Sequence, residues 1–75
     1  MNTKLFCDKI DDFIKTKYGS VNVIKKMSLN QKQELYTQLT NLGLSLYGSH
    51  ETDKKKLLTD IKETVRKYIN NALIQ

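Results

Sequence analysis

The sequence has no proline, three glycines, one cysteine and one histidine among its 75 residues. The absence of proline leaves helices free of their strongest interruption. The glycines are isolated and form no phosphate-binding loop. A single cysteine cannot form an internal disulfide, so we expect a reducing, cytoplasmic setting. One histidine and one cysteine also fall short of the roughly four ligands of a zinc site. We therefore expect no metal, no cofactor and no enzymatic activity.

Long apolar runs are also missing. No stretch approaches the ~18 apolar residues that a membrane-spanning helix needs. Near the N-terminus, Asp8 closely follows Leu5 and Phe6, which is unlike a signal peptide. We expect a single domain, residues 1–75, with no membrane association. Its core must be thin, because a chain of this size buries only about 60% of its unfolded surface.

The charge is positive but depends almost wholly on lysine. The formal net charge is +5, and Arg66 is the one arginine among thirteen basic residues. Arginine reads guanine edges and phosphates through paired hydrogen bonds, so its scarcity weakens a case for sequence-specific DNA recognition. A lysine-rich composition is also typical of an AT-rich genome, and that interpretation stays open.

The chain is organised around the segment 27–47, where leucines recur at the spacing of one helix face. This stripe, which we expect to be core, consists of Leu35, Leu39, Leu42 and Leu46. A second row beside it consists of Tyr36, Gly43 and Tyr47. Ser28 and Gln31 have capping-box spacing, which predicts the start of this helix. Gly43 inside the helix indicates either a bend or the close approach of another helix, and the unbroken stripe favours close packing.

Two further amphipathic segments flank this helix. We expect a helix over 4–18, capped by Asn2 or Thr3 and ended by Gly19 in a left-handed conformation. Its polar face includes Asp8, Asp11 and Asp12. The last helix is expected over 53–73, capped by Ser49 or Thr52, with Glu63 and Lys67 paired at four-residue spacing. The segment 20–27 has β-branched residues but no partner strand, so we interpret it as a short helix capped by Ser20, with Ile24 inward. The predicted fold is all-α, a small helical bundle of three main helices plus one short helix.

Several residue types that often carry chemistry have simpler interpretations here. His50 lies in a polar turn without a nucleophile beside it, which favours a solvent-exposed histidine. Cys7 lies on the apolar flank of the first helix, which favours a structural thiol over a reactive one. The three aspartates of that helix share its wet face with lysines, which is typical of a solvated surface and not of a metal site.

A basic ridge on the last helix is the first candidate binding feature. Lys55, Lys62 and Arg66 share one line on the helical wheel, and no acidic residue interrupts it. Such a ridge is able to follow phosphates or meet an acidic protein face. The alternative is an ordinary lysine-coated helix surface. Lys56 and Lys67 differ from the ridge, because they share their face with acidic residues that partly neutralise them.

Tyr36 and Tyr47 are the second candidate. Tyrosine is enriched in interfaces because its large apolar ring ends in a polar tip. The alternative is that both rings lie at the edge of this chain's own core.

These patterns predict a small, non-enzymatic regulatory or adaptor protein that binds another macromolecule, with a protein partner favoured. Its size and composition fit the accessory proteins of phages and plasmids, including inhibitors of host systems. Three amphipathic helices in so short a chain also favour self-association as a homodimer. The alternative function is a small basic nucleic-acid-binding regulator.

Overall fold

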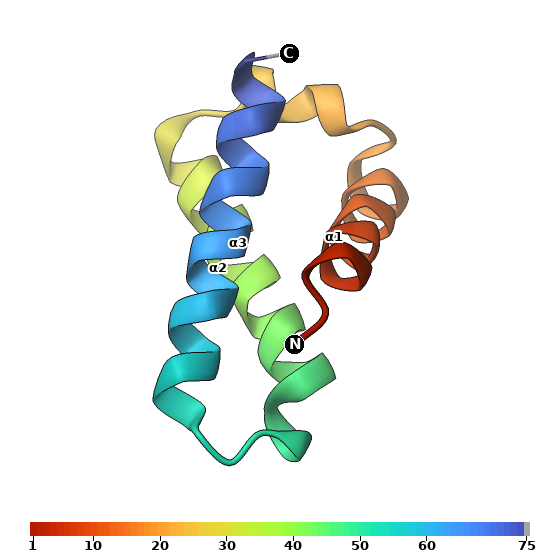
Figure 1. Ribbon diagram of the computed structural model, residues 1–75. Helices are drawn as coiled ribbons and strands as arrows, with labels where there is room; N and C mark the ends of the chain where they lie inside the picture. The colour runs from red at the N-terminus through yellow and green to blue at the C-terminus, as the bar shows by residue number, and fades with distance from the viewer. Residues whose placement is uncertain (75) are drawn as a thin grey trace.

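The computed structural model describes residues 1–74, and all of its regular structure is helical (Figure 1). The α-helices are α1 (Thr3–Tyr18), α2 (Leu29–Tyr47) and α3 (Lys54–Ile74). Two 3-10 helices, η1 (Val21–Lys26) and η2 (Gly48–His50), connect them. The expected all-α bundle is therefore confirmed. None of the helices within residues 1–74 combines the length and apolar character that crossing a bilayer requires.

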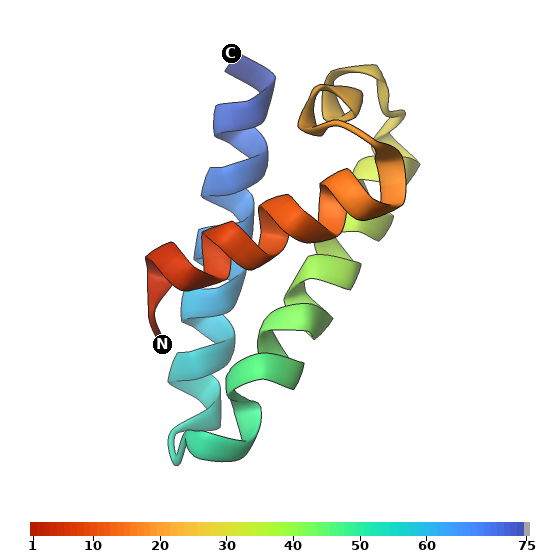
Figure 2. The same ribbon diagram turned by 90° about the vertical axis from the view of Figure 1, so that its right-hand side faces the viewer.

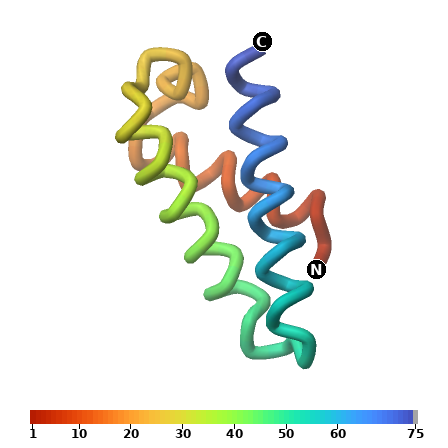
Figure 3. The backbone as a smooth tube through the Cα atoms, turned by 90° about the vertical axis from the view of Figure 1, so that its left-hand side faces the viewer, coloured from red at the N-terminus to blue at the C-terminus, as the bar shows by residue number. Residues whose placement is uncertain are grey.

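The bundle consists of a helix pair with a third helix laid across it. α2 and α3 run antiparallel, joined by η2 at one end of the molecule (Figure 1). α1 crosses one face of this pair obliquely, in front of both helices in Figure 2. Figure 3 looks at the molecule from the other side, where α2 and α3 stand in front of α1. One face of the α2–α3 pair is therefore covered by α1, and no helix of residues 1–74 covers the other.

The helix starts follow the capping signals in the sequence, with one exception. Asn2 Oδ1 accepts from the Leu5 backbone N–H at 3.0 Å. Ser28 and Gln31 form the expected capping box, with bonds of 3.2 Å and 2.8 Å. The prediction of Ser49 or Thr52 as the cap of α3 was wrong. Asp53 Oδ1 accepts from the Lys56 N–H at 3.1 Å instead, because η2 carries the chain past Ser49 before α3 begins.

The connection between α1 and α2 also behaves as expected. Gly19 has φ of +88° and its N–H donates to the Lys15 carbonyl at 2.9 Å, which ends α1 in a conformation that favours glycine. Ser20 then accepts from the Asn22 N–H at 3.1 Å and starts η1. Ile24 is fully buried, so this short helix closes one end of the core.

The core draws on every α-helix and on η1. Its apolar side chains are Phe6, Ile10, Ile14, Ile24, Leu35, Leu39, Leu57, Ile61, Val65, Ile69 and Ala72. In the expected leucine stripe of α2, Leu35 and Leu39 are fully buried and Leu42 is half-buried against the core, whereas Leu46 is 36% exposed. Thr40 and Gly43 are buried in its place. The helix is rotated toward the row that contains Gly43, because α1 and α3 both approach α2 at that glycine.

Gly43 is the point of closest packing. A Cβ atom placed there would lie 2.8 Å from Ile61 Cγ2 on α3 and 2.8 Å from Phe6 Cζ on α1. Both distances are too short for a real side chain. The close-packing interpretation of Gly43 is therefore confirmed, and the glycine allows three helices to meet.

A polar cluster ties α1 to α3 beside the core. The Tyr68 hydroxyl donates to Asp11 Oδ1 at 2.7 Å, and Lys15 Nζ lies 2.7 Å from Asp11 Oδ2. Asp11 is partly exposed beside Lys15, as expected for the wet face, and the α1 crossing also brings it to Tyr68. The hydrogen bond from Lys15, followed by that from Tyr68, lowers the pKa of the Asp11 carboxyl. Burial, and then the bond to Asp11, raises the pKa of Tyr68.

Candidate partner-binding face

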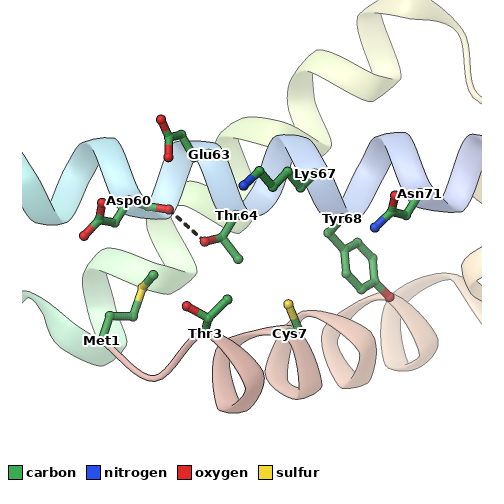
Figure 4. Close-up of a pocket in the computed structure, with 9 residues that line it drawn as sticks. All are labelled: Met1, Thr3, Cys7, Asp60, Glu63, Thr64, Lys67, Tyr68 and Asn71. Atoms are coloured by element: carbon green, nitrogen blue, oxygen red, sulfur yellow. Dashed lines mark hydrogen bonds between the residues drawn. The ribbon is translucent and has the colours of Figure 1, made fainter.

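The basic ridge lies on the side of α3 that faces away from α1. Thr64 is buried and lines the seam between α1 and α3 (Figure 4). Lys62 and Arg66 are each two residues from Thr64, which places them about 200° around the helix from it. Both side chains are exposed. The ridge therefore borders the open face of the α2–α3 pair, which we call the outer face.

Tyr36 reaches the same face from α2. Gln38 faces α1, because its Oε1 accepts from Lys17 Nζ at 2.9 Å. Tyr36 is two residues before Gln38, so it points away from the contact with Lys17, and it lines a pocket between α2 and α3 together with Arg66. The structure thus brings together two candidate residues, Tyr36 and Arg66, that the sequence separates by 30 positions.

Between these helices runs a groove of about 300 Å³, which we call the outer groove. It is lined by Lys32, Gln33, Tyr36, Arg66, Ile69 and Asn70. Ile69 is 9% exposed and forms the apolar floor, with the half-buried ring of Tyr36 beside it. Lys32 and Arg66 bring a positive charge from each helix. An apolar floor with cations on both sides suits an anionic ligand that also offers an apolar group.

Exposed leucines extend the outer groove at one end. Leu29 lies one turn before Gln33 on α2 and is 71% exposed. Leu73 lies one turn after Ile69 on α3 and is 38% exposed. Because the two helices are antiparallel, both leucines lie beyond the same end of the groove. The apolar surface of the outer face therefore continues past the six lining residues.

No acidic side chain of α3 joins the ridge. Asp60 and Glu63 line the seam between α1 and α3, on the other side of the helix. Lys55, like the rest of the ridge, is exposed. The expected pairing of Glu63 with Lys67 does not form, since the one ion pair within residues 1–74 joins Lys15 to Asp11. The distinction between the ridge and Lys67 therefore depends on which face each residue occupies and not on specific salt bridges.

Tyr47 has a different environment from Tyr36. Its ring packs edge-on against Phe6, with centroids 5.9 Å apart and planes at 82°. Its hydroxyl is buried and makes no hydrogen bond to any part of residues 1–74. Tyr47 does not line the outer groove. Its geometry is that of an aromatic side chain at the edge of the core.

The seam between α1 and α3 holds a second hollow, shown in Figure 4. Cys7 points into it from α1, and Thr64 and Tyr68 point into it from α3. Burial, and then the charge of Asp8, raises the pKa of the Cys7 thiol, so the thiolate is disfavoured. Thr64 uses its hydroxyl to bond the Asp60 carbonyl at 2.8 Å. No histidine lines this hollow, and residues 1–74 contain no cluster of side chains able to hold a metal ion.

The sequence did not identify the other contributors to the outer face, which are Leu29, Lys32, Gln33, Ile69, Asn70 and Leu73. Leu29 lies away from the leucine stripe of α2, and Lys32, seven residues before Leu39, borders the stripe but is charged, so an apolar pattern does not include it. A helical wheel of α2 with the outer face marked by Tyr36 would have included Lys32, which lies one turn before it.

Comparison with protein-family models, with curated proteins and with solved structures finds no match to this chain.

Proposed function

We propose that this protein is a non-enzymatic adaptor or regulator that binds an acidic surface of another protein through its outer face. The observation that carries this proposal is the outer groove, where the ring of Tyr36 adjoins Arg66 and Lys32 on a face that α1 leaves open. Tyrosine and arginine are, with tryptophan, the residue types enriched among those that dominate the free energy of protein interfaces. We also propose that the protein acts as an accessory protein of a phage or plasmid.

A protein partner is favoured over nucleic acid by the apolar part of the face. Leu29 and Leu73 are exposed next to the groove, where contact with phosphates would leave them in water. A protein partner would bury them and gain the free energy of that burial. A second candidate, a nucleic-acid-binding regulator, is supported by the exposed line of Lys55, Lys62 and Arg66 with no acid beside it.

The test is a pull-down from nuclease-treated extract with the wild type and two matched double variants. Lys62→Ala/Arg66→Ala removes the ridge charge beside the groove, and Lys56→Ala/Lys67→Ala removes the same charge from the opposite flank. We expect one protein to be recovered by the wild type and by the flank variant but not by the ridge variant. All of these side chains are exposed, so both variants should melt within about 1 kcal/mol of the wild type.

Two results would contradict the proposal. Equal recovery by the ridge and flank variants would mean that the ridge is an ordinary solvated surface. Recovery from an untreated extract that is lost in the nuclease-treated one, with duplex DNA affinity falling steeply as salt rises, would support the nucleic-acid alternative. In that case each lost phosphate contact should reduce the log–log salt slope by roughly 0.9.

We further propose that the protein self-associates and is cytoplasmic, each on a separate observation. Leu5 and Leu46 are 46% and 36% exposed, and the contact of Phe6 with Tyr47 brings the ends of α1 and α2 that carry these leucines together. This apolar region is the one we propose for a homodimer. Sedimentation should show a dimer at high micromolar concentration, and a strict monomer would rule it out. The single Cys7 is compatible with a reducing compartment.

A further inference from the structure

We infer that the outer groove takes an acidic amphipathic α-helix of the partner, with a carboxylate on Arg66 and an apolar side chain on the floor formed by Tyr36 and Ile69. This inference rests on the proposed function and specifies the chemistry of its ligand. The shape of the groove, its charge and the length of its apolar surface support it.

The shape favours a helix over an extended segment. The groove lies between two antiparallel helices, and a third helix fits such a seam by inserting its side chains between the ridges of the pair. α1 already packs on the opposite face in this manner, with Phe6 inserted at Gly43. Addition of a partner strand needs a free sheet edge, and residues 1–74 contain no strand. A proline-rich ligand needs a groove lined by several aromatic rings, whereas Tyr36 is the one ring here.

The positive charge of the outer groove determines that the ligand should be negatively charged. Arg66 and Lys32 lie on opposite helices of one groove, in a chain of net charge +5. The planar guanidinium of Arg66 matches a carboxylate through two parallel hydrogen bonds. The same charge argues against a second copy of this chain as the occupant, since two such faces would repel each other.

The length of the apolar surface explains why the ligand should be amphipathic. Tyr36 and Ile69 form the apolar part of the groove, and the exposed Leu29 and Leu73 continue it by one helical turn. A ligand helix with apolar residues at intervals of three and four would cover both turns with one face. Acidic residues beside that stripe would then meet Lys32 and Arg66.

The test is selection from a displayed library of helical peptides about 18 residues long, roughly five turns, with one face randomised over acidic, basic, amide and apolar residues. The target is the full chain, and selected peptides are then measured against Arg66→Glu, Tyr36→Ala and the flank variant Lys56→Ala/Lys67→Ala. We expect enrichment of net acidic peptides with an apolar stripe. Their affinity should fall about tenfold or more in Arg66→Glu, fall in Tyr36→Ala and stay unchanged in the flank variant.

A charge exchange makes the test specific to the groove. Lysine in place of the selected acidic residue should weaken binding to the wild type and restore part of the binding to Arg66→Glu. Selection of neutral or basic peptides, no selection at all, or affinities unaffected by Arg66→Glu would overturn the inference. If the pull-down partner still depends on Arg66 in that event, the proposed function stands and only the helical ligand is wrong.

Discussion

Gly43 offers the sharpest test of how the three helices are packed. Alanine at position 43 would place a Cβ 2.8 Å from both Ile61 Cγ2 and Phe6 Cζ. Ile61 and Phe6 are fully buried, so neither has free space into which to move. Forcing an extra methyl group into a well-packed core costs about 1–3 kcal/mol. Replacing a mid-helix glycine by alanine stabilises the helix by about 1 kcal/mol through its higher helix propensity. We therefore expect Gly43→Ala to lower the free energy of unfolding by about 1 kcal/mol.

Gly48 is the matched control, because it is a glycine without such neighbours. A Cβ there would meet nothing within 4 Å, and its φ of −63° suits any residue. Gly48→Ala should be neutral or raise the free energy of unfolding by about 0.4–1 kcal/mol, by restricting the unfolded chain. Urea unfolding followed by far-UV circular dichroism measures both variants. If Gly43→Ala stabilises the protein as much as Gly48→Ala, the close approach of the helices is refuted.

A double-mutant cycle identifies the clash itself. Phe6→Leu removes the ring atom that lies closest to position 43, although it is destabilising alone because a buried ring is lost. In that background Gly43→Ala should cost less than in the wild type, with a coupling of about 0.5 kcal/mol or more. Strict additivity of the two substitutions would show that the cost of alanine does not come from the ring of Phe6.

Three further outcomes follow from the burial and hydrogen bonding described above. Leu39→Ala should lower the free energy of unfolding by about 2–5 kcal/mol in urea titrations, and Leu44→Ala, at 37% exposure, by much less. Similar losses would mean that the phase of α2 is wrong. Tyr68→Phe should cost about 0.5–1.5 kcal/mol at neutral pH by removing the hydrogen bond to Asp11. Because the pKa of Asp11 is lowered in the folded state, its contribution is present above the unfolded value of about 3.9 and lost as pH falls through the folded value. Asp11→Asn should therefore flatten the acid limb of a stability–pH profile, and an unchanged limb would contradict this.

The helices themselves could be predicted from the sequence because their signals are local. The capping box of Ser28 and Gln31, the cap at Asn2 and the glycine after α1 each involve residues within four positions of one another. Ile24 was assigned correctly inside a segment with β-branched residues, since a lone strand has no partner. The prediction of close packing at Gly43 was also confirmed, although the identity of its neighbours, Phe6 and Ile61, required the structure.

The errors and omissions arose where a local pattern left several arrangements open. Leu46 continues the leucine stripe, but α1 crosses α2 near Gly43 and leaves the end of the stripe partly in solvent. Asp11 looks like a surface residue on its own helix, and only the crossing of α1 over α3 brings it to Tyr68. The outer groove has the same origin, because Tyr36 and Arg66 become neighbours through the pairing of α2 with α3. No spacing within the sequence encodes that contact.

The two interactions proposed for this protein are partner binding at the outer groove and homodimer formation through Leu5 and Leu46. They use different parts of the surface. A two-fold dimer through the outer face would bring Arg66 and Lys32 of each chain toward those of the other, and such repulsion is unfavourable without intervening acids. The region around Leu5 and Leu46 carries charges of both signs beside it, since Asp8 and Lys9 both lie within one turn of Leu5. It lies where α1 packs on α2, away from the outer groove between α2 and α3. Dimer formation through the leucines would therefore leave both outer grooves free, and a dimer would present two binding sites to an acidic partner.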